Sequence, residues 1–183
     1  MEPPSTAIFV FEHPGCERQA KPVLRRLPPL AGEPVLIGRA DGLRDSHGAV
    51  LAGSFLRTRR IAFDCTGREF PRVFVHEVFH FVWLRRPNAV RRSFEEVLRR
   101  EWLSGARGEL GWSAEWRKAR LAKRDHELRT RRWREYCCES FCDTAAWLYS
   151  GLDGHDEFTL TPSYRRRRRA WFRSWIEPRS LSI

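Results

Sequence analysis

The chain has 183 residues, of which 34 are Lys or Arg and 23 are Asp or Glu, which gives a formal net charge of +11. Hydrophobic residues make up 42% and aromatic residues 13%, which excludes a disordered basic tail because this apolar content is enough for a folded core. Only three of the basic residues are Lys. Because GC-rich coding can produce such an arginine bias, the charge alone does not establish nucleic-acid binding.

Residues 1–66 are predicted to consist mainly of strands and loops. Short runs rich in β-branched and aromatic residues are separated by Pro, Gly, Asp and Ser, which favours a small antiparallel or mixed sheet. The predicted strands cover residues 7–11, 34–38, 50–55 and 60–63.

Residues 67–183 are predicted to be mainly helical. Pro71 is best tolerated within a first helical turn, so the first helix is expected to begin near Phe70 or Pro71. It is expected to end at about Arg85, before Pro87.

Three further helical regions are expected. A capping-box pattern beginning at Ser93 predicts a second helix that ends at Gly105. Residues 113–149 are predicted to form two helices or one kinked helix, and a last helix opens at Pro162. Helical spacing places an aromatic face of this last helix against the core, with most of its arginines outward. The residues on that face are Tyr164, Arg168, Trp171, Phe172 and Trp175.

The length predicts a single domain covering residues 1–183, and the order of the elements predicts an α+β fold. The five Cys are odd in number and include no CxxC pair, which favours reduced thiols over disulfides. The N-terminus lacks the pattern of a secretory leader, and no apolar stretch approaches the roughly 20 residues of a membrane span. We therefore expect a cytoplasmic protein without a membrane span.

The strongest chemical signal is the HExxH pattern His76-Glu77-Val78-Phe79-His80. On a helix, residues four apart share a face, so both imidazoles can bind one metal ion while Glu77 lies at the open side of the metal. Two neutral imidazole nitrogens suit Zn²⁺, and a carboxylate beside metal-bound water can act as its general base. Apolar neighbours predict a buried helix, in which a metal would satisfy these polar groups, although hydrogen-bonded core histidines are the alternative.

A catalytic zinc site usually takes three protein ligands, so a third has to come from elsewhere in the chain. Glu139 and Asp143 are four residues apart in a strongly helical, apolar segment and therefore share a face. One carboxylate can bind the metal while the other accepts the N–H of a ligating His and fixes its tautomer. A solvent-exposed acidic pair is the alternative interpretation.

An HExxH pattern followed by ExxxD on a later helix is similar to the gluzincin branch of the zincin metallopeptidases. The resemblance implies a zincin-like domain, in which a small N-terminal β-sheet packs on the active-site helix. It also implies that His76, His80 and Glu139 bind one Zn²⁺, that Glu77 activates the water, and that Asp143 orients His76. The small size would fit ImmA/IrrE-like relatives, and the charge would fit SprT-like proteases, which act on proteins attached to DNA.

Other side chains are further candidates for ligands or for stabilising an oxyanion. Cys142 could complete a His₂Cys site, although Cys in an apolar helix is more often a core residue. His126 and His155 could complete a His₃ site, but His126 is expected at the surface because its sequence neighbours are charged. An oxyanion could be stabilised by His155 or by one of three tyrosines, Tyr136, Tyr149 and Tyr164.

The sequence therefore predicts a zinc metallopeptidase acting on a peptide or protein substrate. Two rival hypotheses stay open: a nucleic-acid-associated protein with a structural zinc site, and a zincin-fold scaffold that regulates a partner without hydrolysis. A third alternative is metal-dependent hydrolysis of another amide or an ester, which differs from the peptidase hypothesis only in its substrate. The Arg-rich surface could contact nucleic acid or another anionic partner.

Overall fold

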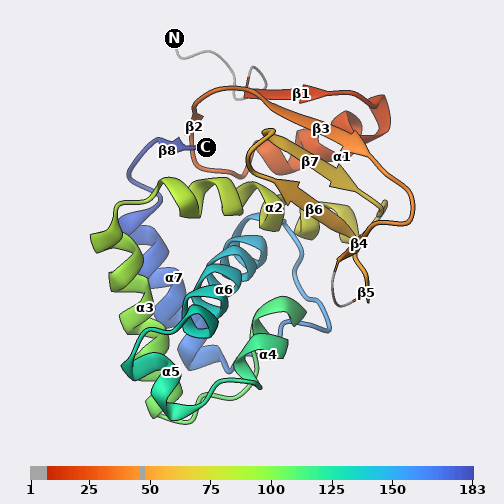
Figure 1. Cartoon of the computed structure of the whole chain (residues 1–183). Helices are drawn as coiled ribbons and strands as arrows, with labels where there is room; N and C mark the ends of the chain where they lie inside the picture. The colour runs from red at the N-terminus through yellow and green to blue at the C-terminus, as the bar shows by residue number, and fades with distance from the viewer. Residues whose placement is uncertain (1–7, 46–47) are drawn as a thin grey trace.

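The computed structural model describes residues 8–45 and 48–183. Ala7, which we expect to begin a strand, lies outside these ranges. The N-terminal residues that lack the pattern of a secretory leader also lie outside them. The described residues form a mixed α and β fold with one small mixed sheet and a larger helical part, which is compatible with the α+β class (Figure 1). No helix in the described part of the chain is both long and apolar enough to cross a membrane.

Four strands form the main sheet, in the spatial order β1-β3-β7-β6. These strands are β1 (Phe9–Phe11), β3 (Val35–Arg39), β6 (Ala52–Phe55) and β7 (Arg60–Phe63). The pairs β1–β3 and β3–β7 are parallel, whereas β6 pairs antiparallel with β7. All four match segments predicted as strands, although β3 ends one residue beyond its predicted segment, and β6 is an edge strand of the sheet.

Two very short strand pairs form separate two-stranded sheets. β2 (Leu30–Ala31) pairs in parallel with β8 (Leu181–Ser182), and β4 (Arg44–Asp45) pairs antiparallel with β5 (Gly48–Ala49). These strands were not predicted, because two residues are too few to show a periodic pattern. The β2–β8 pair brings the C-terminal residues against the N-terminal third of the chain (Figure 1).

Residues 14–24 form the helix α1 (Pro14–Leu24), so the prediction of strands and loops is wrong for this segment. Pro14 takes the first helical position, where its missing N–H is not needed, and the His13 side chain accepts the Gly15 N–H at 3.0 Å. The buried positions follow helical spacing, namely Cys16, Ala20, Val23 and Leu24.

The HExxH pattern lies on α2 (Glu69–Arg85), which runs between the sheet and α6 (Arg131–Tyr149) (Figure 1). The helix begins one or two residues before the predicted start at Phe70 or Pro71, because Pro71 still lies in the first turn, where backbone N–H groups have no helical acceptor. As predicted, the helix is buried on nearly all sides. Its fully buried aromatic residues are Phe70, Phe74, Phe79 and Phe81.

The second predicted helix, α3 (Asn88–Leu103), begins five residues before the expected cap. Ser93 lies inside the helix, where its hydroxyl donates to the Val90 carbonyl at 2.8 Å and accepts the indole N–H of Trp171 at 3.0 Å. The next predicted region divides into three helices rather than one or two. They are α4 (Trp112–Lys118), α5 (Lys123–Glu127) and α6.

The last helix, α7 (Pro162–Trp175), docks through its aromatic face, which confirms the prediction. Trp171 and Phe172 are buried, and the Phe172 ring stacks on Phe141 of α6 with ring centroids 5.1 Å apart. Four arginines of the helix are exposed, namely Arg166, Arg167, Arg169 and Arg173.

Candidate metal centre

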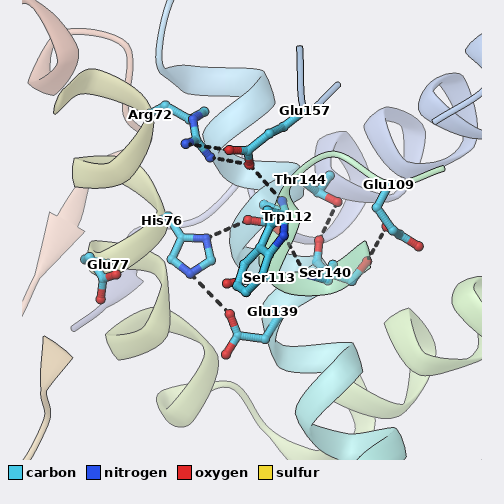
Figure 2. Close-up of polar contacts among 12 residues, drawn as sticks. Arg72, His76, Glu77, Glu109, Trp112, Ser113, Glu139, Ser140, Thr144 and Glu157 are labelled. Carbon is cyan, nitrogen blue, oxygen red and sulfur yellow. Dashed lines mark hydrogen bonds and ion pairs between the residues drawn. The ribbon is translucent and has the colours of Figure 1, made fainter. Parts of the chain in front are cut away.

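Helices α2 and α6 bring three donor groups to one point. The Nε2 atoms of His76 and His80 are 3.2 Å apart. The Oε2 atom of Glu139 lies 3.3 Å from the His76 Nε2 and 4.0 Å from the His80 Nε2. In a tetrahedral zinc site with bonds of about 2.0–2.1 Å, the donor atoms are themselves about 3.3 Å apart. The two imidazoles and the carboxylate could therefore hold one metal ion, and Figure 2 shows His76 and Glu139 pointing toward one another.

Asp143 contacts the His76 ring at Nδ1, the nitrogen that faces away from His80 and Glu139. Its Oδ1 atom lies 2.7 Å from His76 Nδ1, so the carboxylate accepts the Nδ1–H, and the Nε2 of the same ring faces Glu139. The other oxygen, Oδ2, accepts the backbone N–H of Ala114 at 3.1 Å. The structure thus brings Asp143 and His76 together in the predicted pairing, and it also uses Asp143 to hold the first turn of α4.

Gly111 allows this contact between α4 and Asp143, because a Cβ at position 111 would lie 2.2 Å from the Asp143 Cγ. We expect Gly111→Ala to displace Asp143 or α4, to lower the free energy of unfolding by about 1–3 kcal/mol as overpacking does, and to weaken metal binding by the three donors. Urea denaturation measures the loss of stability, and competition with a chelator measures the loss of metal affinity.

Gly154→Ala is the matched control for this change, because no heavy atom lies within 4 Å of a Cβ at position 154. Its stability should stay within about 1 kcal/mol of the wild type. A Gly111→Ala protein with wild-type stability and wild-type metal affinity would show that Asp143 is not confined by α4.

The contacts among the donors shift their pKa values. Burial lowers the pKa of His76, but the carboxylates of Asp143 and Glu139 outweigh it, so the pKa is raised well above its usual value. Burial likewise lowers the pKa of His80, but Cys138 and Glu139 raise it to about 9. Burial raises the pKa of Glu139, but the two imidazoles lower it to about 2. A metal ion binding here would have to displace the imidazole protons.

Glu77 contacts the edge strand of the sheet through Ser54. The Ser54 Oγ lies 2.5 Å from Glu77 Oε2 and 2.9 Å from the Glu77 carbonyl oxygen. The Ser54 hydroxyl has one hydrogen and donates it to one of these two oxygens at a time, and either bond ties the predicted general base to β6. Glu77 is only 8% exposed, and it lines the same cavity as the three donors.

A cavity of about 710 Å³ lies beside these donors. Its walls come from β6, α2, α4 and α6, together with residues of the β4–β5 pair. Three large apolar side chains that line it are exposed to solvent, Leu51 by 43%, Phe55 by 50% and Trp112 by 57%. The donor cluster therefore faces an open space with an edge strand and apolar side chains around it.

Arg117 is a site residue that sequence reasoning missed. Its Nη2 atom lies 3.2 Å from the Glu139 Oε1, which leaves the other oxygen, Oε2, to face the imidazoles. This contact fixes the orientation of the Glu139 carboxylate. No local spacing rule relates residues 117 and 139, because they meet only through the packing of α4 on α6.

Of the other candidate residues, Cys142 lies close to His80, and the rest do not line the cavity. Cys142 groups with Cys138 and His80 rather than with His76. His155 Nε2 lies 3.0 Å from Glu69 Oε1, outside the cavity lining. The hydroxyls of Tyr136, Tyr149 and Tyr164 contact Glu109, Glu177 and Ser104, and none of these tyrosines lines the cavity.

His126 is buried, so the prediction that it lies at the surface is wrong. It is 7% exposed, and its ring packs edge-on against Trp133 with ring centroids 6.0 Å apart. Neither ring nitrogen has a hydrogen-bond partner among the described residues. The short helix α5 packs against α6 here, so tertiary contacts bury His126 despite its charged sequence neighbours, and it does not reach the cavity.

Three of the five predicted site residues share one donor cluster, Asp143 supports it, and Glu77 lines the adjoining cavity. The residues come from two helices that are far apart in the sequence, and the packing of α2 on α6 brings them together (Figure 1). No family model matches the sequence, and no curated protein or solved structure is significantly similar to it.

Proposed function

We propose that this chain is a zinc metallopeptidase with a zincin-like fold, in which His76, His80 and Glu139 hold one zinc ion. The observation that carries the proposal is the convergence of these three donors at the wall of an open cavity that Glu77 also lines. Structural zinc sites are usually closed by four protein ligands, whereas three ligands leave a position for water or substrate. The open cavity therefore supports a catalytic site over a structural one.

Zinc bound to these donors supplies Lewis-acid polarisation of a carbonyl and makes water more acidic. Glu77 takes a proton from the attacking water as the new C–O bond forms, and it returns a proton to the departing amine as the C–N bond breaks. Asp143 keeps the Nδ1–H of His76 engaged, so that the Nε2 lone pair is free for the metal. Ser54 holds the Glu77 carboxylate at the cavity wall.

The edge strand β6 supports an extended peptide as the substrate. All four of its residues line the cavity, and among the described strands it pairs only with β7. An exposed strand edge can bind an extended peptide through main-chain hydrogen bonds, while pockets for alternate side chains provide specificity. Leu51, Phe55 and Trp112 are placed to contact large apolar side chains of such a peptide.

Digestion of a mixed peptide library tests this function. Wild-type protein and the Glu77→Gln variant, each loaded with one equivalent of zinc, are incubated with the library, and the products are identified by mass spectrometry. We expect cleavage by the wild type that a chelator abolishes. We expect the rate to fall by about 10²–10⁴-fold in Glu77→Gln, because a positioned general base contributes this much.

Glu127→Gln is the matched control, since Glu127 lies on α5, is exposed, and pairs with Lys123 at 3.9 Å. This variant should cleave the library at the wild-type rate. A zinc-loaded wild type that cleaves no peptide would contradict the proposal and favour a regulatory scaffold. Equal rates for the wild type and Glu77→Gln would remove Glu77 from the chemistry.

A further inference from the structure

A second group of metal-ligand side chains lies on the other side of His80. The Cys138 Sγ is 3.5 Å from the Nδ1 of His80, whereas the zinc-site donors approach the Nε2 of the same ring. Cys142 follows Cys138 by one helical turn of α6. The ligand atoms of His80, Cys138 and Cys142 all lie within 4.8 Å of one another.

Helix α6 therefore carries two adjacent pairs of ligand residues at i and i+4. Glu139 and Asp143 present oxygen atoms toward the imidazoles, whereas Cys138 and Cys142, one position earlier, present sulfur. Carboxylates suit harder ions, and thiolates select soft ions such as Cu⁺. The two sides of His80 thus differ in the kind of metal that they favour.

The spacing of the sulfur side fits direct coordination. With a metal–nitrogen bond of about 2.0 Å and a metal–sulfur bond of about 2.3 Å, a tetrahedral site separates nitrogen and sulfur by about 3.5 Å. The observed distance from His80 Nδ1 to Cys138 Sγ is also 3.5 Å. Cys138 is partly exposed and Cys142 is fully buried, so an ion would reach the site from the Cys138 side.

We propose that His80, Cys138 and Cys142 form a second metal site for a soft, thiophilic ion of the Cu⁺ or Cd²⁺ class. A neutral imidazole has one N–H and one lone pair, so His80 can give its lone pair to the sulfur site through Nδ1 or to the zinc site through Nε2. A soft ion at the sulfur site therefore opposes zinc binding. This antagonism rests on the proposed zinc site, whereas the sulfur site itself does not.

Titration of the zinc-free protein with Cd²⁺ tests the site, because cadmium–thiolate bonds give a charge-transfer absorption in the ultraviolet. We expect the wild type to develop this absorption with one equivalent of Cd²⁺, and we expect Cys138→Ala and Cys142→Ala to lose most of it. Cys137→Ala is the matched control, since Cys137 is buried on the same helix but lies outside the cluster. Circular dichroism establishes that each variant is folded.

Glu139→Gln separates the two sites, because it removes a donor of the zinc site and none of the sulfur site. It should keep the Cd²⁺ absorption while losing zinc, and one equivalent of Cd²⁺ should release zinc from the loaded wild type. Absence of the absorption in the wild type, or equal loss in Cys137→Ala and Cys142→Ala, would overturn the sulfur site whatever the peptide digest shows. An intact absorption in a protein that binds no zinc would contradict only the proposed function.

Discussion

We expect the wild type to retain a single equivalent of zinc after dialysis and Glu139→Ala to lose it. Without Glu139, only the two imidazoles of α2 face the metal position, and catalytic zinc usually needs three protein ligands. His76→Ala and His80→Ala should lose the metal in the same way. Glu77→Gln should keep it, because the Glu77 carboxylate contacts Ser54 rather than the donor cluster. Elemental analysis of the purified proteins measures the zinc content.

Glu135→Ala is the control on the same helix, because Glu135 lies one turn before Glu139, is exposed, and pairs with Arg131 at 2.6 Å. It should retain zinc fully. Asp143→Ala should give an intermediate result, with zinc affinity lower by about 10–100-fold, as is typical when a residue that orients a ligand is removed. Full zinc retention in Glu139→Ala would exclude the proposed ligand set.

The parts of the fold that were predicted from sequence are those whose pattern is local and strong. The strands β1 and β3 and the helix α2 are rich in large apolar residues. The buried face of α1 is built partly from the small residues Cys16 and Ala20, and Pro22 lies within its last turn, so its helical period was easily overlooked. At α3, the capping-box pattern predicts a helix start at Ser93, but Ser93 lies inside the helix and its hydroxyl donates to the Val90 carbonyl.

The same distinction applies to the site. His76 with His80, and Glu139 with Asp143, share a face through i, i+4 spacing, which the sequence displays directly. Arg117 joins them through the packing of α4 on α6, and the Cys138 contact to His80 depends on the rotation of α6 about its axis. Such tertiary relations have no signature in the spacing of a single sequence.

Arg168→Met is expected to be one of the most destabilising single substitutions in the chain. Arg168 is fully buried, and its guanidinium lies 2.6 Å from Glu101 Oε2 and 2.7 Å from Glu109 Oε2. Lys118 Nζ approaches Glu109 Oε1 at 3.0 Å, so two cations balance two carboxylates. Removing one partner from a buried ion pair costs about 3–5 kcal/mol, because the remaining charge loses its compensation. Urea denaturation at neutral pH measures this loss.

The pH dependence of the loss distinguishes an ionic cause from lost packing. Burial raises the pKa of Glu101 even beside Arg168, so it should rise further in Arg168→Met. A carboxyl whose folded pKa exceeds its unfolded pKa binds more protons when folded, and its destabilising effect shrinks as the pH falls. The difference in stability between wild type and variant should therefore decrease from pH 7 to pH 5. A difference that is constant with pH would indicate lost packing.

In the wild type, the pKa of Glu109 is shifted in the opposite direction to that of Glu101, so its effect on stability has the opposite pH dependence. Burial raises its pKa, but Arg168 and Lys118 outweigh this and lower it to about 2. A carboxyl with a lowered folded pKa stabilises the fold above its unfolded pKa, which is about 4.3 for Glu, and this contribution is lost as the pH falls toward 2. The wild type should therefore lose stability over this acidic range.

Arg173→Met is the matched control on the exposed side of α7, and it should change the free energy of unfolding by no more than about 0.5 kcal/mol. Glu101→Gln added to Arg168→Met should restore part of the lost stability, because it removes the unpaired carboxylate.

The cluster also includes Ser140 of α6, which accepts from Arg168 Nη1 at 2.8 Å. Since α6 also supplies Glu139, we expect Arg168→Met to lower zinc affinity as well, although residue 168 is not a donor. Wild-type stability in this variant would show that the buried charges do not depend on one another.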